Sequence, residues 1–158
     1  MSFQLSEQLD ADASSAFAFY KKYVGNFKHK FPTSVLAVLE NPNWYGGCDS
    51  KAPHDGVLKS IAIEGIGTES SHIELLISKP WINLNIRLRY KGVFNFELPN
   101  LGSLADTIEW RYEQFRYYDP YYAHGIKNKK MFTHDIEWMC GTIWRITASD
   151  IEAEWINA

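Results

Sequence analysis

The sequence predicts an α+β domain in which N-terminal helices pack on a mainly antiparallel β-sheet of about six to seven strands. Apolar residues recur at helical spacing only within residues 11–41, whereas apolar and polar residues alternate from residue 57 to about residue 147. Aromatic residues make up 15% of the chain, which favours strands and a large core. A chain of 158 residues fits one domain, 1–158, of which residues 1–10 are expected to be loose.

The first predicted helix carries one apolar stripe. Its members recur at spacings of three and four: Phe17, Tyr20, Val24, Phe27 and Phe31. Asp12, Ser14 or Ser15 can cap the start of this helix, and Pro32 ends it, because proline restricts the residue before it. A short second helix should follow, capped by Thr33 or Ser34 and ending before residue 42.

Alternation predicts the strands that follow a loop over residues 44–53. Residues 57–64, 71–78 and 81–90 each place apolar side chains on one face, and residues 81–90 do so most clearly. A turn is expected at Lys91-Gly92, before the next short strand.

The last strands are less regular. Ile108, Trp110 and Tyr112 share a face, but the parity then slips, which predicts a bulge near Gln114. A hairpin over residues 132–146 should close the sheet. Residues 148–157 leave a choice open, and a last short helix is one interpretation.

Charge and composition exclude several classes of function. The formal net charge is −3 and lysines 127, 129 and 130 are interpreted as a solvated turn, so no nucleic-acid partner is expected. No signal peptide or membrane span is visible, and Cys48 and Cys140 suit free thiols, so a cytoplasmic location is predicted. No nucleotide-binding motif occurs, and no cofactor is expected.

Two His-Asp pairs raise the alternative of a metal-assisted hydrolase that would use His54, Asp55 and His134. Imidazole and carboxylate groups bind divalent metals and can activate water. Each pair introduces a strand, where neighbouring side chains point to opposite faces. His134 and Asp135 are therefore not expected to bind the same metal ion. This geometry favours a half-buried, hydrogen-bonded histidine. A small-molecule module with an aromatic pocket between helix and sheet is a further alternative.

A dense aromatic run marks a contact surface. Seven aromatic residues fall within residues 110–122, and alternation can send only about half of them to the core. We predict an aromatic and acidic surface that binds a protein partner through Trp44, Tyr45, Tyr117, Tyr118, Asp119, Tyr121 and Tyr122. The competing interpretation is that these rings fold back and cover an open edge of the sheet.

Three stretches carry a family resemblance: PHDGVLKSIAI (53–63), FTHDIEW (132–138) and IWRITASDI (143–151). Over residues 52–151 the chain resembles small, uncharacterised bacterial proteins that include immunity proteins of polymorphic toxin systems. The resemblance implies a non-enzymatic protein that binds and neutralises a toxin domain. It brings no catalytic residues and leaves the oligomeric state open.

Overall fold

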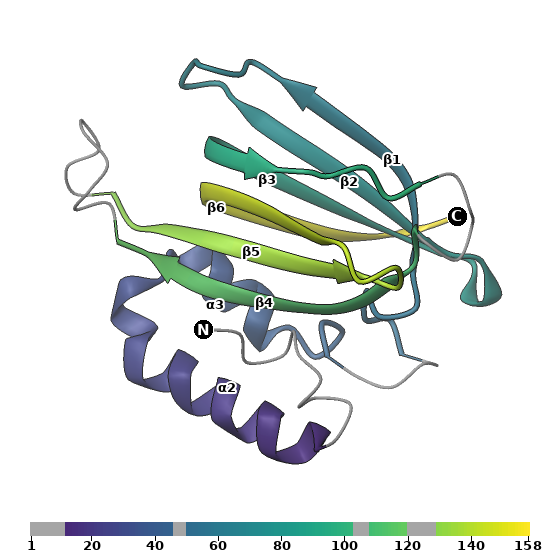
Figure 1. Cartoon of the computed structure of the whole chain (residues 1–158), viewed down its shortest axis with the longest axis horizontal. Coiled ribbons are helices and arrows are strands. Elements are labelled where there is room, and N and C mark those ends of the chain that lie inside the picture. The colour runs from purple at the N-terminus through teal and green to yellow at the C-terminus, as the bar shows by residue number, and fades with distance from the viewer. Residues whose placement is uncertain (1–11, 46–49, 103–107, 120–128) are drawn as a thin grey trace.

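Two α-helices precede a six-stranded antiparallel sheet in the computed structural model, which describes residues 12–45, 50–102, 108–119 and 129–158 (Figure 1). The α+β class predicted from the sequence is confirmed. The predicted contact residues Tyr121 and Tyr122, as well as Cys48 and residues 1–10, lie outside the described residues.

Helix α2 (Ala13–Phe27) begins at Asp12, whose carboxylate accepts a hydrogen bond of 3.1 Å from the Ser15 backbone N–H. A single 3-10 turn, η1 (Lys28–Lys30), leads through Pro32 into α3 (Thr33–Glu40). No side chain caps α3, so the predicted Thr33 or Ser34 cap is wrong. The Ser34 hydroxyl instead accepts a hydrogen bond from the Ile151 N–H at 3.3 Å, which ties α3 to the sheet.

The strands lie in the order β1-β2-β3-β6-β5-β4, and all neighbours are antiparallel. Their bounds are β1 (Val57–Glu64), β2 (His72–Lys79), β3 (Leu84–Glu97), β4 (Trp110–Tyr118), β5 (Met131–Trp138) and β6 (Ile143–Asn157). A short 3-10 turn, η2 (Pro80–Ile82), separates β2 from β3. The sequence predicted β1 to the residue and β2 to within one residue at each end.

The turn predicted at Lys91-Gly92 is a bend within one strand. β3 continues through it because β6 pairs with both halves of β3, and the register shifts between Val93 and Asn95. Gly92 has a φ of 59°, and a Cβ atom there would lie 2.2 Å from the Ser149 hydroxyl oxygen. Only glycine satisfies both conditions, so Gly92 lets the long strand bend without ending.

Residues 148–157 belong to β6, so the interpretation as a last helix is wrong and the sheet runs ten residues beyond its predicted end at 147. Glu152 pairs with Arg89 across the strands and Glu154 with Arg87, whereas Ile151 and Ala153 face Tyr90 and Leu88. The partner strand therefore decided between two conformations that the local sequence allowed.

The two edge strands meet at one corner of the sheet. The Asp55 N–H donates to the Trp110 carbonyl at 2.9 Å, and the Trp110 N–H donates to the Gly56 carbonyl at 2.7 Å. A bridge between Val57 and Glu109 completes the contact. The sheet therefore curls, and its concave face holds a core that includes Phe31, Val35, Val38 and Trp44 from the N-terminal segment.

Helix α2 covers the outer edge of β4 (Figure 1). The Tyr20 hydroxyl accepts a hydrogen bond from the Phe115 N–H at 2.7 Å and donates one to the Phe115 carbonyl at 3.1 Å. The Tyr23 hydroxyl accepts from the Tyr117 N–H at 3.2 Å. Two tyrosines thus occupy the position of a seventh strand along this edge.

Of the helices in the described ranges, none is long and apolar enough to cross a membrane.

Replacing Tyr20 with Phe should lower the free energy of unfolding by about 1–3 kcal/mol, because both backbone groups of Phe115 would remain buried without this partner. Urea denaturation measures the change. Tyr23→Phe is the matched control and should cost less, since Tyr23 is half-buried and water can replace its hydroxyl. Equal losses in the two variants would contradict this account of the β4 edge.

Candidate functional site

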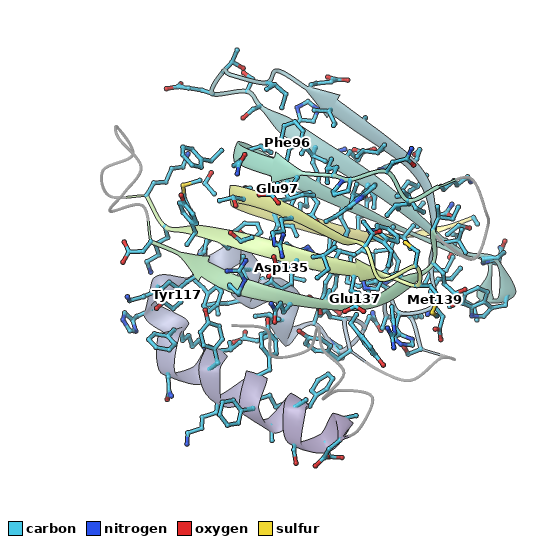
Figure 2. All side chains as sticks on the ribbon, in the orientation of Figure 1. Phe96, Glu97, Tyr117, Asp135, Glu137 and Met139 are labelled. Atoms are coloured by element: carbon cyan, nitrogen blue, oxygen red, sulfur yellow. The ribbon has the colours of Figure 1, made fainter. Side chains whose placement is uncertain are left out.

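A groove of about 310 Å³ opens where α2 ends and where β4 leads toward β5. We call it the Tyr117 groove, and its lining residues are His29, Lys30, Tyr117, Tyr118, Asp119, Lys129 and Lys130. Three of the seven predicted contact residues, Tyr117, Tyr118 and Asp119, therefore lie together in one hollow. Figure 2 shows Tyr117 on β4 beside α2.

Rings from α2 hold Tyr117 in place. Its ring stacks on Tyr23 with centroids 5.9 Å apart and planes 14° apart, and it lies 4.9 Å from the Phe27 ring. The Lys30 ammonium lies 4.6 Å from the centroid of the Tyr117 ring, within reach of a cation–π interaction. Tyr117 therefore forms a half-buried part of the groove that α2 holds in place. The interpretation of a loop whose rings fold back over an open edge concerns Tyr121 and Tyr122, which lie outside the described residues.

The groove is aromatic and basic, which corrects the predicted aromatic and acidic surface. Among the described residues, three lysines and a histidine line it together with one carboxylate, that of Asp119. His29, Lys129 and Lys130 are exposed. The basic residues come from η1 and from the chain just before β5. Folding therefore brings together positive charges that are about 100 residues apart in the sequence.

Trp44 and Tyr45 do not belong to this surface. Trp44 is 1% exposed, so the prediction that it contacts a partner is wrong. The Tyr45 ring packs edge-on against Phe17 at 5.1 Å, and its hydroxyl oxygen is buried. Both residues follow α3 into the concave face, where a large ring is more stable than at the surface.

Trp44 instead joins a polar network inside the core. Its Nε1–H donates to Glu113 Oε1 at 3.0 Å, and Glu113 Oε2 lies 3.1 Å from His134 Nε2. His134 Nδ1 lies 2.7 Å from the Tyr90 hydroxyl. An imidazole protonated on Nε2 satisfies this whole chain, because it donates to the carboxylate and accepts from the hydroxyl.

The network is sealed from solvent. His134 is fully buried rather than half-buried as predicted, and its ring stacks on Phe115 with centroids 4.0 Å apart. Glu113 is 5% exposed. Burial, followed by the charge of Glu113, raises the pKa of Tyr20, Tyr45 and Tyr90 well above 10.0. These groups cross-link the core and do not reach a ligand at the surface.

The two His-Asp pairs make separate contacts. His54 Nδ1 lies 2.9 Å from Asp55 Oδ1 near the surface, and Asp55 has a left-handed φ of 63°. Asp135 (labelled in Figure 2) follows His134 on β5 and therefore points to the opposite face, where it accepts hydrogen bonds from Gln114 at 2.9 Å and from Arg116 at 3.0 Å. Among the residues with described positions, no three His, Cys, Asp or Glu side chains are placed to hold a metal ion.

Glu113 was not recognisable from the sequence as an inward-facing residue, because the parity of the aromatic residues predicts a bulge later in the strand. The register shifts between Trp110 and Tyr112 rather than near Gln114, so Glu113 shares the inner face with Trp110 and Phe115. The basic residues of the groove were not predicted from the sequence either: His29, Lys30, Lys129 and Lys130. The run of lysines before β5 can be recognised in the sequence, but its proximity to His29 and Lys30 cannot.

Neither a protein-family model nor a curated protein matches this chain. The residues of the Tyr117 groove and of the core network are therefore the basis for inferring a function.

The buried tyrosines should make the protein sensitive to alkaline pH. A raised pKa in the folded state contributes stability that is complete below pH 10 and is lost above it, because only the unfolded chain releases these protons. Each such group should lower the free energy of unfolding by about 1.4 kcal/mol per pH unit above about pH 10.

Urea denaturation at several alkaline pH values tests this slope. Tyr90→Phe should make the decline shallower than in the wild type, because it removes one of the buried hydroxyls whose pKa is raised. Titration of all 9 tyrosines with ordinary pKa values in the folded protein, followed by tyrosinate absorbance, would contradict the prediction.

Proposed function

We propose that this protein is a non-enzymatic binding protein whose Tyr117 groove receives an acidic segment of a protein partner. The observation that carries the proposal is the gathering of His29, Lys30, Lys129 and Lys130 around a tyrosine that α2 holds in place. Lysine ammonium groups attract carboxylates, and ordered tyrosines lose little conformational entropy on binding.

The charge distribution supports an acidic partner. The chain has a net charge of −3, so a locally basic groove stands out against an acidic background. On the outer face of the sheet, Glu74, Glu152 and Glu154 are largely neutralised by ion pairs with arginines and a lysine. Complementary charge of this kind mainly accelerates association and excludes wrong partners.

A toxin domain is the partner that the resemblance to immunity proteins implies, and we propose it as the first protein partner to test. In that case the toxin would present acidic side chains to the groove. We do not propose the metal-assisted hydrolase, because His134 is buried between Tyr90 and Glu113 while His54 pairs with Asp55 near the surface.

Charge reversal in the groove tests the proposal. A fluorescently labelled glutamate-rich peptide should bind the wild type at low salt, and the double variant Lys129→Glu, Lys130→Glu should bind it at least about tenfold more weakly. The matched control is Lys21→Glu, Lys22→Glu, which makes the same charge change at exposed positions on α2. The control should retain affinity within about twofold, and circular dichroism should show that both variants are folded.

Equal losses in the two double variants would show attraction by overall charge and would overturn the groove. A labelled oligothymidylate that bound more tightly than the peptide, with the same loss in the groove variant, would assign the groove to nucleic acid. Displacement of the peptide by free phosphate at equal concentration would assign it to a small anion. Either result would overturn the proposed protein partner.

A further inference from the structure

The two edges of the sheet differ in how their backbone groups are satisfied. Tyr20 and Tyr23 hydrogen-bond the outer groups of β4. Within the described parts of the chain, residues 58–64 of β1 make no hydrogen bond on their outer side, and only Val57 bridges to Glu109. Figure 1 shows β1 at the rim of the sheet, far from α2.

The open part of β1 also exposes apolar side chains. Ile61 is 39% exposed and Ile63 is 40% exposed, although both lie directly opposite fully buried residues of β2, Leu75 and Ile73. They therefore face the concave side of the sheet. The buried core on this side extends to β2 but does not cover these two side chains of β1. Monomeric proteins usually protect such an edge with proline, lysine or a bulge.

That protection is confined to the start of β1. The register shift lies between Leu58 and Ser60, so Lys59 occupies the bulge. From Ser60 to Glu64 the strand is regular, β-branched at two positions and fully paired with β2. This segment is therefore a template for one more antiparallel strand.

We infer that β1 pairs antiparallel with β1 of a second copy of this chain, across a two-fold axis at Ala62, so that one sheet continues through both copies. This inference is independent of the proposed function, because the Tyr117 groove lies at the β4 edge. A two-fold axis perpendicular to the sheet places residues of the same face opposite each other.

The sequence of β1 is complementary to itself in this register. With Ala62 opposite Ala62 of the second copy, Ile61 lies opposite Ile63 of the other chain, and this pair occurs twice on the concave face. Ser60 lies opposite Glu64 on the outer face, and Lys59 comes beside Glu64 of the other copy, so opposite charges meet. An unrelated strand would have no reason to match both the isoleucines and the charges.

The pairing would satisfy the outer backbone groups of both strands and cover four isoleucines. The segment is short, and interfaces well below about 1,200 Å² are usually weak. A dimer that dissociates on dilution is therefore the expected form.

Sedimentation equilibrium over a range of protein concentrations tests the pairing. The wild type should approach twice the mass of one chain as concentration rises, and Ile63→Lys should dimerise at least about tenfold more weakly, because it places two ammonium groups in the seam. Phe19→Lys is the matched control, since Phe19 is 64% exposed and lies on α2, far from the β1 edge (Figure 1). Circular dichroism should confirm that both variants fold.

Disulfide trapping tests the register in a Cys48→Ser, Cys140→Ser background. Opposite residues in an antiparallel pair have Cα atoms about 4.5–5.5 Å apart, which a disulfide can span. Ala62→Cys should therefore form a cross-linked dimer under mild oxidation, whereas Ser60→Cys, which faces Glu64, should do so at least about tenfold more slowly.

A wild type that remains monomeric at every concentration would overturn the inference, including the case in which β1 pairs only with a different protein. Dimerisation unaffected by Ile63→Lys would place the contact elsewhere and would also overturn it. So would cross-linking of Ser60→Cys at the rate of Ala62→Cys.

Discussion

The pairing of β3 with β6 is the constraint on which the rest of the structure depends. The two strands run antiparallel from Leu84 opposite Asn157 to Glu97 opposite Arg145. This register decides which side chains of both strands face the core. β2 and β1 extend the sheet on one side, and β5 and β4 extend it on the other. At one corner of the sheet the starts of β1 and β4 lie together, joined by hydrogen bonds of Asp55 and Gly56 with Trp110.

The curled sheet is closed by polar contacts as well as by apolar packing. Tyr90, Glu113, His134 and Trp44 come from three strands and from the segment after α3, yet they form one chain of hydrogen bonds. A buried carboxylate is costly without partners, so alternative packings that leave Glu113 unpaired are strongly disfavoured. The network therefore specifies the depth at which Trp44 enters the core and the registers of β4 and β5.

Helix α2 links the stability of the sheet to its surface chemistry. The same stripe of rings that satisfies the β4 edge also positions Tyr117, and η1, which follows the helix, places His29 and Lys30 at the groove. The opposite edge has no such cover among the described residues. The molecule thus presents a basic groove at one edge and an open strand at the other, which are distinct surfaces.

Local periodicity by itself determined the fold class, α2, β1, β2 and the opposite orientation of His134 and Asp135. These features follow from which side of its own element a residue faces, and nearby residues decide that. Only the tertiary structure decided the burial of Trp44, the inward turn of Glu113, the strand conformation of residues 148–157 and the basic character of the Tyr117 groove. Each of these depends on a neighbour from a distant part of the chain: a partner strand that selects extended backbone, a concave face that takes up a large ring, or two short basic segments that folding brings together.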